Sequence, residues 1–222
     1  MYIENKENLR EILKDSKVLI CDLDGAIIDS EVMHFKAWKD TLSLYIGISI
    51  TEEDIKRYIS HDDYSICNMV KEDYTVNFVD DFIIEKRRER FESYLETEEF
   101  KKNELLSSLI KDSSFCKNYK YLVTSQDINL GQKELENIGL ERDFNMSYWN
   151  VQDKSDIYDL IVSNLVLDKG IKDGYVLVED SLKYIEIGKN LGFKVIGVEH
   201  KYNKDKFEEY IKNGNSLDII RM

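Results

Sequence analysis

The stretch Val18-Leu19-Ile20-Cys21-Asp22-Leu23-Asp24-Gly25-Ala26-Ile27-Ile28-Asp29-Ser30 joins a short apolar run to a cluster of acidic residues. The run Val18–Cys21 is typical of a central strand in a parallel sheet, where both faces of the strand are buried. The acidic residues then lie at the carboxyl end of the strand, where open parallel sheets bind their ligands. Since side chains alternate along an extended chain, Asp22 and Asp24 face the same side.

Two neighbouring carboxylates repel each other, so Asp22 and Asp24 need a cation or a proton close by. A hard divalent ion such as Mg2+ suits them, because proteins bind it through one or two carboxylates together with phosphate oxygens of the substrate. The stretch therefore predicts a magnesium site at the end of this strand.

This segment resembles the first motif of the haloacid dehalogenase superfamily, Asp-x-Asp-Gly-Thr/Val-x-x-Asp-Ser/Thr. The positions of the motif are occupied by Asp22, Asp24, Gly25, Asp29 and Ser30. Ala26 replaces the usual Thr or Val, a small change that leaves the carboxylates untouched. The resemblance implies a Rossmann-like α/β core, a Mg2+ cofactor and phosphoryl-transfer chemistry.

The composition is that of a globular chain with a strong negative charge. Its 222 residues suffice for one large domain or two small ones with a buried core, and 42% of them are hydrophobic. The formal charge of −13 disfavours nucleic acid and anionic membranes as partners, because either would need a basic surface. A small phosphorylated substrate stays compatible, since a metal ion and one lysine offset its charge locally.

The sequence favours a cytoplasmic protein with reduced thiols. No segment approaches the roughly 20 apolar residues of a membrane span, and residues 1–7 lack the apolar region of a signal peptide. The three cysteines, Cys21, Cys67 and Cys116, form no metal-ligand pattern, so buried thiols are expected. Cys21 belongs to the apolar strand with its side chain directed away from Asp22, which assigns it to the core rather than to catalysis.

Between Ser30 and about Lys102 the patterns predict helices and no strand. Apolar residues at spacings of three and four predict a helix over 32–45 that stops at Gly47. Thr51 and the acidic residues after it predict the start of a second helix, which continues through Tyr58. Two more helices are expected at about 63–72 and 78–95. The apolar face of the first helix is expected to contain Val32, Phe35, Trp38, Leu42 and Tyr45. That of the last helix is expected to contain Phe82, Ile83, Phe91 and Leu95.

Elsewhere helices and strands alternate, which predicts a doubly wound parallel sheet with right-handed crossovers. Strands are expected at 119–124, 144–148, 175–179, 194–198 and 217–220, and helices at 4–15, 104–111, 130–138, 154–165, 181–191 and 204–212. We therefore expect an α/β core domain, residues 1–30 and 103–222, with an inserted all-helical cap domain, residues 31–102.

Two further predicted strand ends carry groups that the superfamily uses to bind a phosphoryl group. Thr124-Ser125 follows an apolar strand where the family places a hydroxyl, with Ser125 the first choice and Thr124 the alternative. Lys154 stands where the family has a lysine, although both prolines of the usual Lys-Pro-x-Pro-Asp-x-Phe/Tyr are missing. Each also has an ordinary explanation, because Ser and Thr often cap helices and most lysines are surface residues.

The last motif is Glu179-Asp180-Ser181, which follows the apolar run from Tyr175 to Val178. It is similar to the family's acidic Glu-Asp-Ser/Thr motif, which implies that Asp180 is a ligand of Mg2+ and Glu179 a ligand either directly or through water. An acidic N-cap of the next helix is the simpler explanation, and it is compatible with this role.

The resemblance implies hydrolysis of a small phosphate monoester through an aspartyl phosphate. Asp22 would attack phosphorus, and Asp24 would act as the acid and the base. Mg2+ would be held by Asp22, the Asp24 carbonyl and Asp180. Lys154 and Ser125 would hold the equatorial phosphoryl oxygens.

The segment Asp29-Ser30-Glu31-x-x-His34-x-x-Ala37-Trp38 is similar to the start of the cap in β-phosphoglucomutase-like enzymes and related sugar-phosphate phosphatases. The similarity implies that His34 acts near the leaving group and that Trp38 packs inside the cap. An exposed surface position is the alternative for His34.

The mutases of this group carry a Gly-x-Ser/x-Arg loop whose arginine grips a second phosphate. Residues 58–63 contain neither glycine nor arginine, although His61 could partly substitute. We therefore expect a Mg2+-dependent phosphatase. The alternatives are a hexose-phosphate mutase and a catalytically idle binding or regulatory protein. We expect a monomer whose partner is a small phosphorylated substrate, most readily a sugar phosphate.

Overall fold

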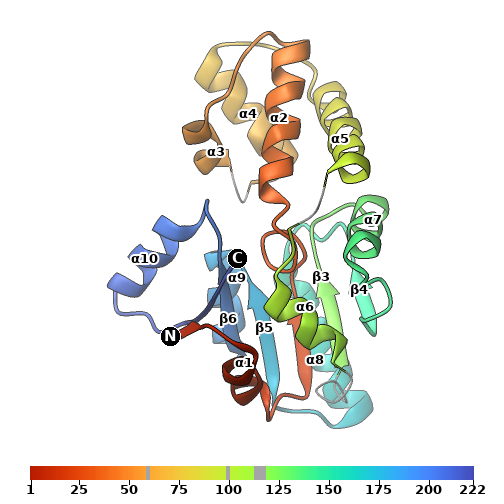
Figure 1. Ribbon diagram of the computed structural model, residues 1–222, viewed down its shortest axis with the longest axis vertical. Helices are drawn as coiled ribbons and strands as arrows, with labels where there is room; N and C mark the ends of the chain where they lie inside the picture. Colours follow the sequence, from red (N-terminus) through yellow and green to blue (C-terminus); the bar gives the residue numbers. More distant parts are fainter. Residues whose placement is uncertain (59–60, 99–100, 113–118) are drawn as a thin grey trace. The chain divides into compact units, whose positions relative to one another are not determined.

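The computed structural model describes residues 1–58, 61–98, 101–112 and 119–222. Its backbone divides into two units (Figure 1). The sheet unit comprises Met1–Asp29 and Phe100–Met222, and the helical unit comprises Ser30–Glu99. The expectation of a buried Cys116 falls outside the described residues.

The described strands form one seven-stranded sheet in the order β1-β7-β6-β5-β2-β3-β4. Each neighbouring pair runs parallel, which confirms the predicted doubly wound sheet. The strands are β1 Tyr2–Ile3, β2 Val18–Cys21, β3 Tyr119–Val123, β4 Met146–Tyr148, β5 Tyr175–Glu179, β6 Lys194–Glu199 and β7 Asp218–Arg221. The sequence analysis missed β1, because a strand of two residues has no measurable periodicity and forms by pairing with β7.

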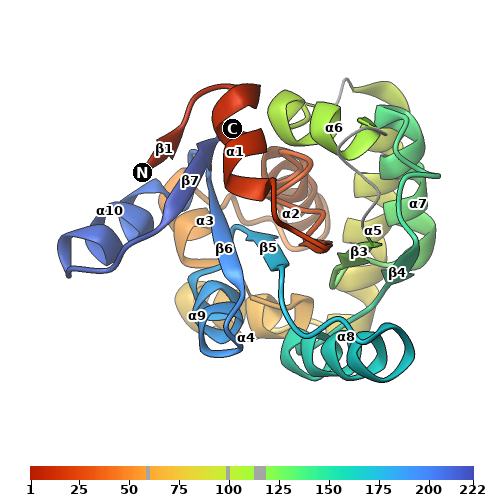
Figure 2. The same cartoon turned by 90° about the horizontal axis from the view of Figure 1, so that it is seen from below.

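Helices cover both faces of this sheet, with α1 and α6 on one side and α8 and α9 on the other (Figure 2). Leu19 and Cys21 of β2 face the first side, whereas Val18 and Ile20 face the second, as alternation in a strand requires. The assignment of Cys21 to the core is thus confirmed. The helices of this unit are α1 Lys6–Leu13, α6 Glu104–Lys111, α7 Ile128–Ile138, α8 Lys154–Lys169, α9 Leu182–Asn190 and α10 Lys204–Lys212.

The helical unit contains α2 Glu31–Tyr45, α3 Glu52–Tyr58, α4 Asp63–Tyr74 and α5 Asp80–Thr97, and its described residues form no strand. Gly47 adopts a φ of 78° just after α2, and the Thr51 hydroxyl accepts the Asp54 N–H at the start of α3. Both are the helix boundaries that the sequence predicts. The core of this unit includes Trp38 and Cys67. None of the described helices is long and apolar enough to cross a membrane.

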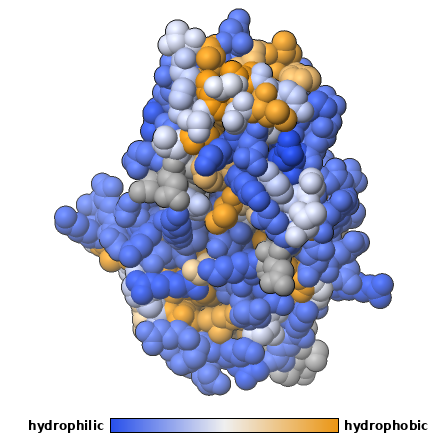
Figure 3. All heavy atoms as spheres, turned by 45° about the horizontal axis from the view of Figure 1, so that its top comes forward, coloured by the Kyte–Doolittle hydropathy of each residue, from blue (hydrophilic) through white to orange (hydrophobic). Residues whose placement is uncertain are grey.

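Three residues expected on apolar helix faces are instead exposed: Val32 by 46%, Tyr45 by 43% and Phe82 by 44%. The buried face of α2 runs through Met33, Ala37, Trp38, Thr41 and Leu42. Residues 32 and 45 lie beside this face, because spacings of three and four are compatible with more than one helix face. The Tyr45 and Phe82 rings pair edge to face with centroids 5.4 Å apart, and exposed apolar side chains gather on this unit (Figure 3).

The segments that lead into and out of the helical unit lie side by side. The Asp29 N–H donates to the Lys101 carbonyl at 2.8 Å, and the Asn103 N–H donates to the Ile27 carbonyl at 2.8 Å. The Asn103 side chain also accepts the Leu106 N–H and so caps α6. The insertion therefore begins and ends at one paired place. That residues 31–102 act as a cap domain stays a prediction.

Gly188 allows α9 to pack against the sheet. A Cβ atom there would lie 2.6 Å from Leu177 Cδ2 and 3.2 Å from Val195 Cγ2. Alanine in a helix is normally favoured over glycine by about 1 kcal/mol, but forcing a methyl into a packed core costs about 1–3 kcal/mol. We expect Gly188→Ala to lower the free energy of unfolding by about 1 kcal/mol in urea titrations.

The matched control is Asn190→Ala, an exposed position at the end of the same helix, which should leave the free energy of unfolding nearly unchanged. A Gly188→Ala protein as stable as the parent would show that the contact between α9 and the sheet relaxes freely.

Candidate active site

The register of the central strands brings three loops to one level. Cys21 of β2 lies opposite Leu122 of β3 and Val178 of β5. The next residue, Asp22, donates its N–H to the Val178 carbonyl at 3.0 Å. Carboxyl ends of aligned parallel strands meet at one edge, so the loops after β2, β3 and β5 share a site.

Lys154 links two of these loops through its ammonium group. Its Nζ lies 2.5 Å from Asp22 Oδ2 and 2.9 Å from Glu179 Oε2, and the lysine side chain is only 5% exposed. Asp153 caps α8 by accepting the Ser155 N–H at 3.0 Å, which fixes Lys154 at the first position of the helix. Lys154 thus reaches Asp22 without the prolines of the family pattern.

The Asp22 carboxylate is held by two donors. Its Oδ1 accepts the Leu23 N–H at 2.7 Å, while Oδ2 receives Lys154. Asp22 is buried. Because both donors come from fixed elements, the orientation of the carboxylate is set before any ligand binds.

Glu179 has both carboxylate oxygens engaged within the protein. Oε2 accepts from Lys154 Nζ and from the Tyr158 hydroxyl, the latter at 3.2 Å. Oε1 accepts the N–H groups of Asp180 and Ser181, each at 3.2 Å. With four donors and no exposed surface, this side chain organises its neighbours.

Asp180 lies against the glycine of the first motif. Gly25 has a φ of 71°, and a Cβ atom there would lie 2.5 Å from Asp180 Oδ2. Glycine is required on both counts, because it tolerates this backbone conformation and leaves space for the carboxylate. On its other side, Asp180 Oδ2 lies 3.1 Å from His200 Nε2.

The electrostatics of this cluster fit a divalent cation. Oxygen atoms of Asp22, Glu179 and Asp180 lie within 4.8 Å of one another. Burial and, next, the charge of Glu179 raise the pKa of Asp22 well above its usual value, although Lys154 opposes this shift. Burial also raises the pKa of Glu179. Burial lowers the pKa of Lys154, but Asp22 and Glu179 outweigh it and raise the value overall.

Three carboxylates and one ammonium leave two formal negative charges in a buried place. Oxygen donors and this excess charge match Mg2+, which binds carboxylates and phosphate oxygens. The residues present therefore fit the implied ion.

The hydroxyl candidates after β3 differ in their surroundings. Thr124 is buried, and its Oγ1 accepts the Gln126 N–H at 3.1 Å. Ser125 is exposed, and its hydroxyl makes no side-chain hydrogen bond with the described residues. Of the two, Ser125 is thus the hydroxyl open to a ligand.

Asp24 is half-buried in the loop after β2, where its backbone bridges to Ile28. A carboxylate oxygen of Asp24 lies within 4.8 Å of one of Glu134, a fully buried residue of α7. The sequence analysis did not select Glu134, because it sits in the middle of an amphipathic helix.

His34 lies in the helical unit and is half-buried, not exposed. Its ring stacks on Phe91 with centroids 4.0 Å apart, and its Nδ1 lies 3.0 Å from Arg87 Nη2. A guanidinium only donates, so Nδ1 accepts and Nε2 carries the ring proton. Arg87 also lies 3.4 Å from Asp63, so two helices of the unit fix the imidazole. His61 is exposed.

Sequence reasoning missed Tyr158 and His200 as members of this site. Tyr158 stands four residues after Lys154, one turn along the same face of α8, so the spacing held a signal for it. His200 directly follows β6, which pairs with β5, the strand that Asp180 follows. A polar residue at the end of β6 was the available signal.

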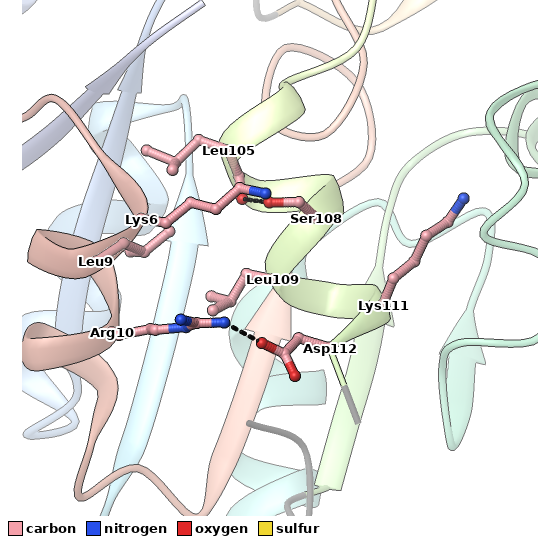
Figure 4. Close-up of a pocket in the computed structure, with 8 residues that line it drawn as sticks. All are labelled: Lys6, Leu9, Arg10, Leu105, Ser108, Leu109, Lys111 and Asp112. Carbon is pink, nitrogen blue, oxygen red and sulfur yellow. Dashed lines mark hydrogen bonds and ion pairs between the residues drawn. The ribbon is translucent and has the colours of Figure 1, made fainter. Parts of the chain in front are cut away.

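A pocket of about 210 Å³ lies away from this cluster, between α1 and α6 (Figure 4). Leu9, Leu105 and Leu109 line it, and an ion pair between Arg10 and Asp112 crosses it. Asp112 is the single carboxylate in the lining, and the Ser108 hydroxyl there donates to the Leu105 carbonyl, so the pocket adds nothing to the chemistry of the strand ends.

Comparison with solved structures finds the same fold repeatedly. CbbY from Rhodobacter sphaeroides, in complex with phosphate, has a TM-score of 0.74 at 17% identity, covering 92% of this chain and 93% of that one. A candidate beta-phosphoglucomutase from Thermotoga maritima has a TM-score of 0.70 at 20% identity, covering 92% and 94%. A CbbY mutant that holds xylulose-(1,5)bisphosphate has a TM-score of 0.71 at 16% identity, covering 86% and 89%. These likenesses show the fold.

No curated protein matches the sequence. The family model of haloacid dehalogenase-like hydrolases matches residues 19–198, from β2 through the acidic motif and into β6. That match spans most of the chain and all of the motifs described above, and the protein therefore belongs to the haloacid dehalogenase-like hydrolase family.

Proposed function

We propose that the protein is a Mg2+-dependent phosphatase that hydrolyses a small phosphate monoester through an aspartyl phosphate. The observation that supports this most is the buried Lys154 between Asp22 and Glu179, with Asp180 beside them. A lysine so placed meets a phosphoryl group and its nucleophile together. When bound, Mg2+ would offset the charge of the phosphoryl oxygens.

Asp22 serves as the nucleophile and Asp24 as the acid and base. Asp22 attacks phosphorus, while Asp24 protonates the leaving oxygen and later deprotonates the attacking water. Lys154 and Ser125 hold the equatorial phosphoryl oxygens, on which the transition state carries charge. The metal would be held by Asp22, the Asp24 carbonyl and Asp180. We place Glu179 behind them, contacting the ion through water, because its oxygens already have four donors.

The substrate in this proposal is a phosphorylated sugar or a compound of similar size. The xylulose bisphosphate held by CbbY, a protein of the same fold, supports that class. A panel of phosphorylated sugars, nucleotides and glycolytic acids, assayed for phosphate release with Mg2+, would identify the compound. The helical unit acts in this proposal as a cap that closes over the substrate and excludes water.

A hexose-phosphate mutase is the second candidate, supported by the fold shared with a candidate beta-phosphoglucomutase. Simple hydrolysis is favoured, because residues 58–63 lack the arginine that grips a second phosphate in such mutases. Product identity with β-glucose 1-phosphate discriminates between them: free phosphate indicates the phosphatase and glucose 6-phosphate the mutase. A catalytically idle binding protein is disfavoured, since Lys154 and the carboxylates are all present.

Asp22→Asn should abolish turnover and leave the protein folded. The change removes the nucleophile and one anionic ligand while preserving the shape of the side chain. Phosphate release should fall below detection, and circular dichroism should be unchanged. Asp168→Asn, at an exposed position in the last turn of α8, is the control and should retain activity. Full activity of Asp22→Asn would contradict the assigned nucleophile.

Activity should depend on Mg2+ and should not be supported by Ca2+. Mg2+ keeps octahedral geometry, whereas Ca2+ admits more ligands and would let Asp22 bind in a form unable to attack. The measurement is the initial rate of phosphate release after EDTA treatment and the addition of each metal. Equal rates with the two ions would count against the site.

His34 should matter most when the leaving group is poor. With Nδ1 accepting from Arg87, His34 presents Nε2 as a donor, and we propose that it assists the leaving oxygen when the cap closes. His34→Ala should therefore slow hydrolysis of a sugar phosphate more than hydrolysis of p-nitrophenyl phosphate, whose leaving group needs little protonation. Equal losses on both substrates, or no loss, would remove His34 from the mechanism.

A further inference from the structure

His200 and Asn203 form a buried polar clip behind Asp180. His200 is 3% exposed and Asn203 is 4% exposed, so neither side chain relies on bulk water. The Asn203 amide donates to the Asp180 carbonyl at 3.1 Å and to the Val198 carbonyl at 2.9 Å, while its oxygen accepts the His200 N–H at 2.8 Å. The loop after β6 is thereby tied to the end of β5.

This clip fixes the tautomer of His200. The Tyr202 N–H lies 3.2 Å from His200 Nδ1, and a backbone N–H can only donate. Nδ1 must accept, so the proton of the ring is on Nε2, which lies 3.1 Å from Asp180 Oδ2. His200 is therefore a neutral donor aimed at one oxygen of Asp180.

The same oxygen is confined from the other side by Gly25, whose missing Cβ would lie 2.5 Å away. The aspartate carboxylate would otherwise rotate about its Cβ–Cγ bond, a torsion with broad preferences. Held between a backbone and an imidazole N–H, it has one orientation. Removing a group that orients a metal ligand in this way typically weakens metal affinity by about 10- to 100-fold.

We propose that His200 is a positioning residue, which holds the Asp180 carboxylate in the orientation that Mg2+ requires. This inference rests on the proposed function, since it takes Asp180 as a ligand of Mg2+. His200 touches neither metal nor substrate and acts only through Asp180. Its contribution is therefore to metal affinity, and it should be separable from any contribution to folding.

The test compares two polar replacements of similar size. In His200→Gln the side-chain amide nitrogen can take the place of Nε2 and donate to Asp180, whereas in His200→Asn the shorter amide reaches only the position of Nδ1. Calorimetric titration of the purified proteins with MgCl2 alone should show affinity about 10-fold weaker for His200→Asn, with His200→Gln within about 3-fold of the parent.

Three controls make the result decisive. Melting temperatures in EDTA establish that each variant is folded, and His200→Phe, which keeps the ring volume, replaces His200→Asn if the latter does not fold. Leu217→Ala, a core truncation beneath Gly197, should lower the melting temperature without changing Mg2+ affinity. Asp180→Asn should lose Mg2+ binding.

The outcomes separate this inference from the proposed function. Equal Mg2+ affinities for His200→Gln and the variant that lacks the donor would overturn the role of His200 while leaving the metal site intact. A parent protein that binds no Mg2+ would instead overturn the proposed function itself. Weaker binding confined to the variant without the donor supports the inference.

Discussion

The buried contact of Lys154 with Asp22 and Glu179 is the interaction on which the rest of the site depends. An isolated ammonium removed from water costs several kcal/mol, so Lys154 is tolerable there only because carboxylates surround it. Those carboxylates are equally unfavourable without a cation. The strand register and the cap of α8 are the parts of the fold that bring them together.

This balance leaves the cluster short of positive charge, and the fold accommodates the deficit with hydrogen bonds. Glu179 receives four donors, and Asp22 receives the Leu23 N–H besides Lys154. Such donors disperse charge without neutralising it. The hydrogen bonds hold the carboxylates in place, while the net negative charge of the cluster still attracts a cation. A cluster preorganised in this way suits Mg2+.

The sequence was sufficient to predict the sheet and the residues of its central loops. Buried parallel strands leave apolar runs of four or five residues, and the acidic motifs stand directly after them, as at Asp22 and Asp180. These signals are local, and so they can be read without tertiary information. Lys154 of the shortened lysine motif lies at the start of α8 and contacts Asp22 and Glu179, and its role in the reaction stays a prediction.

The features that sequence reasoning missed all depend on distant parts of the chain. β1 exists through its partner β7, and the buried face of α2 is selected by the helices packed on it, which left Val32 and Tyr45 exposed. His200 reaches Asp180 because β6 lies beside β5, so that two residues twenty positions apart share an edge of the sheet. No local pattern contains that adjacency.

The choice of a neutral imidazole behind Asp180 follows from the charge balance of the site. A lysine or arginine there would also orient the carboxylate, but its charge would cancel part of the attraction for a metal ion. A backbone N–H fixes the acceptor state of His200 Nδ1, so the ring donates without carrying charge. In the proposed mechanism Lys154 supplies positive charge to the phosphoryl group, and a neutral imidazole beside Asp180 adds no charge that would compete with the cation.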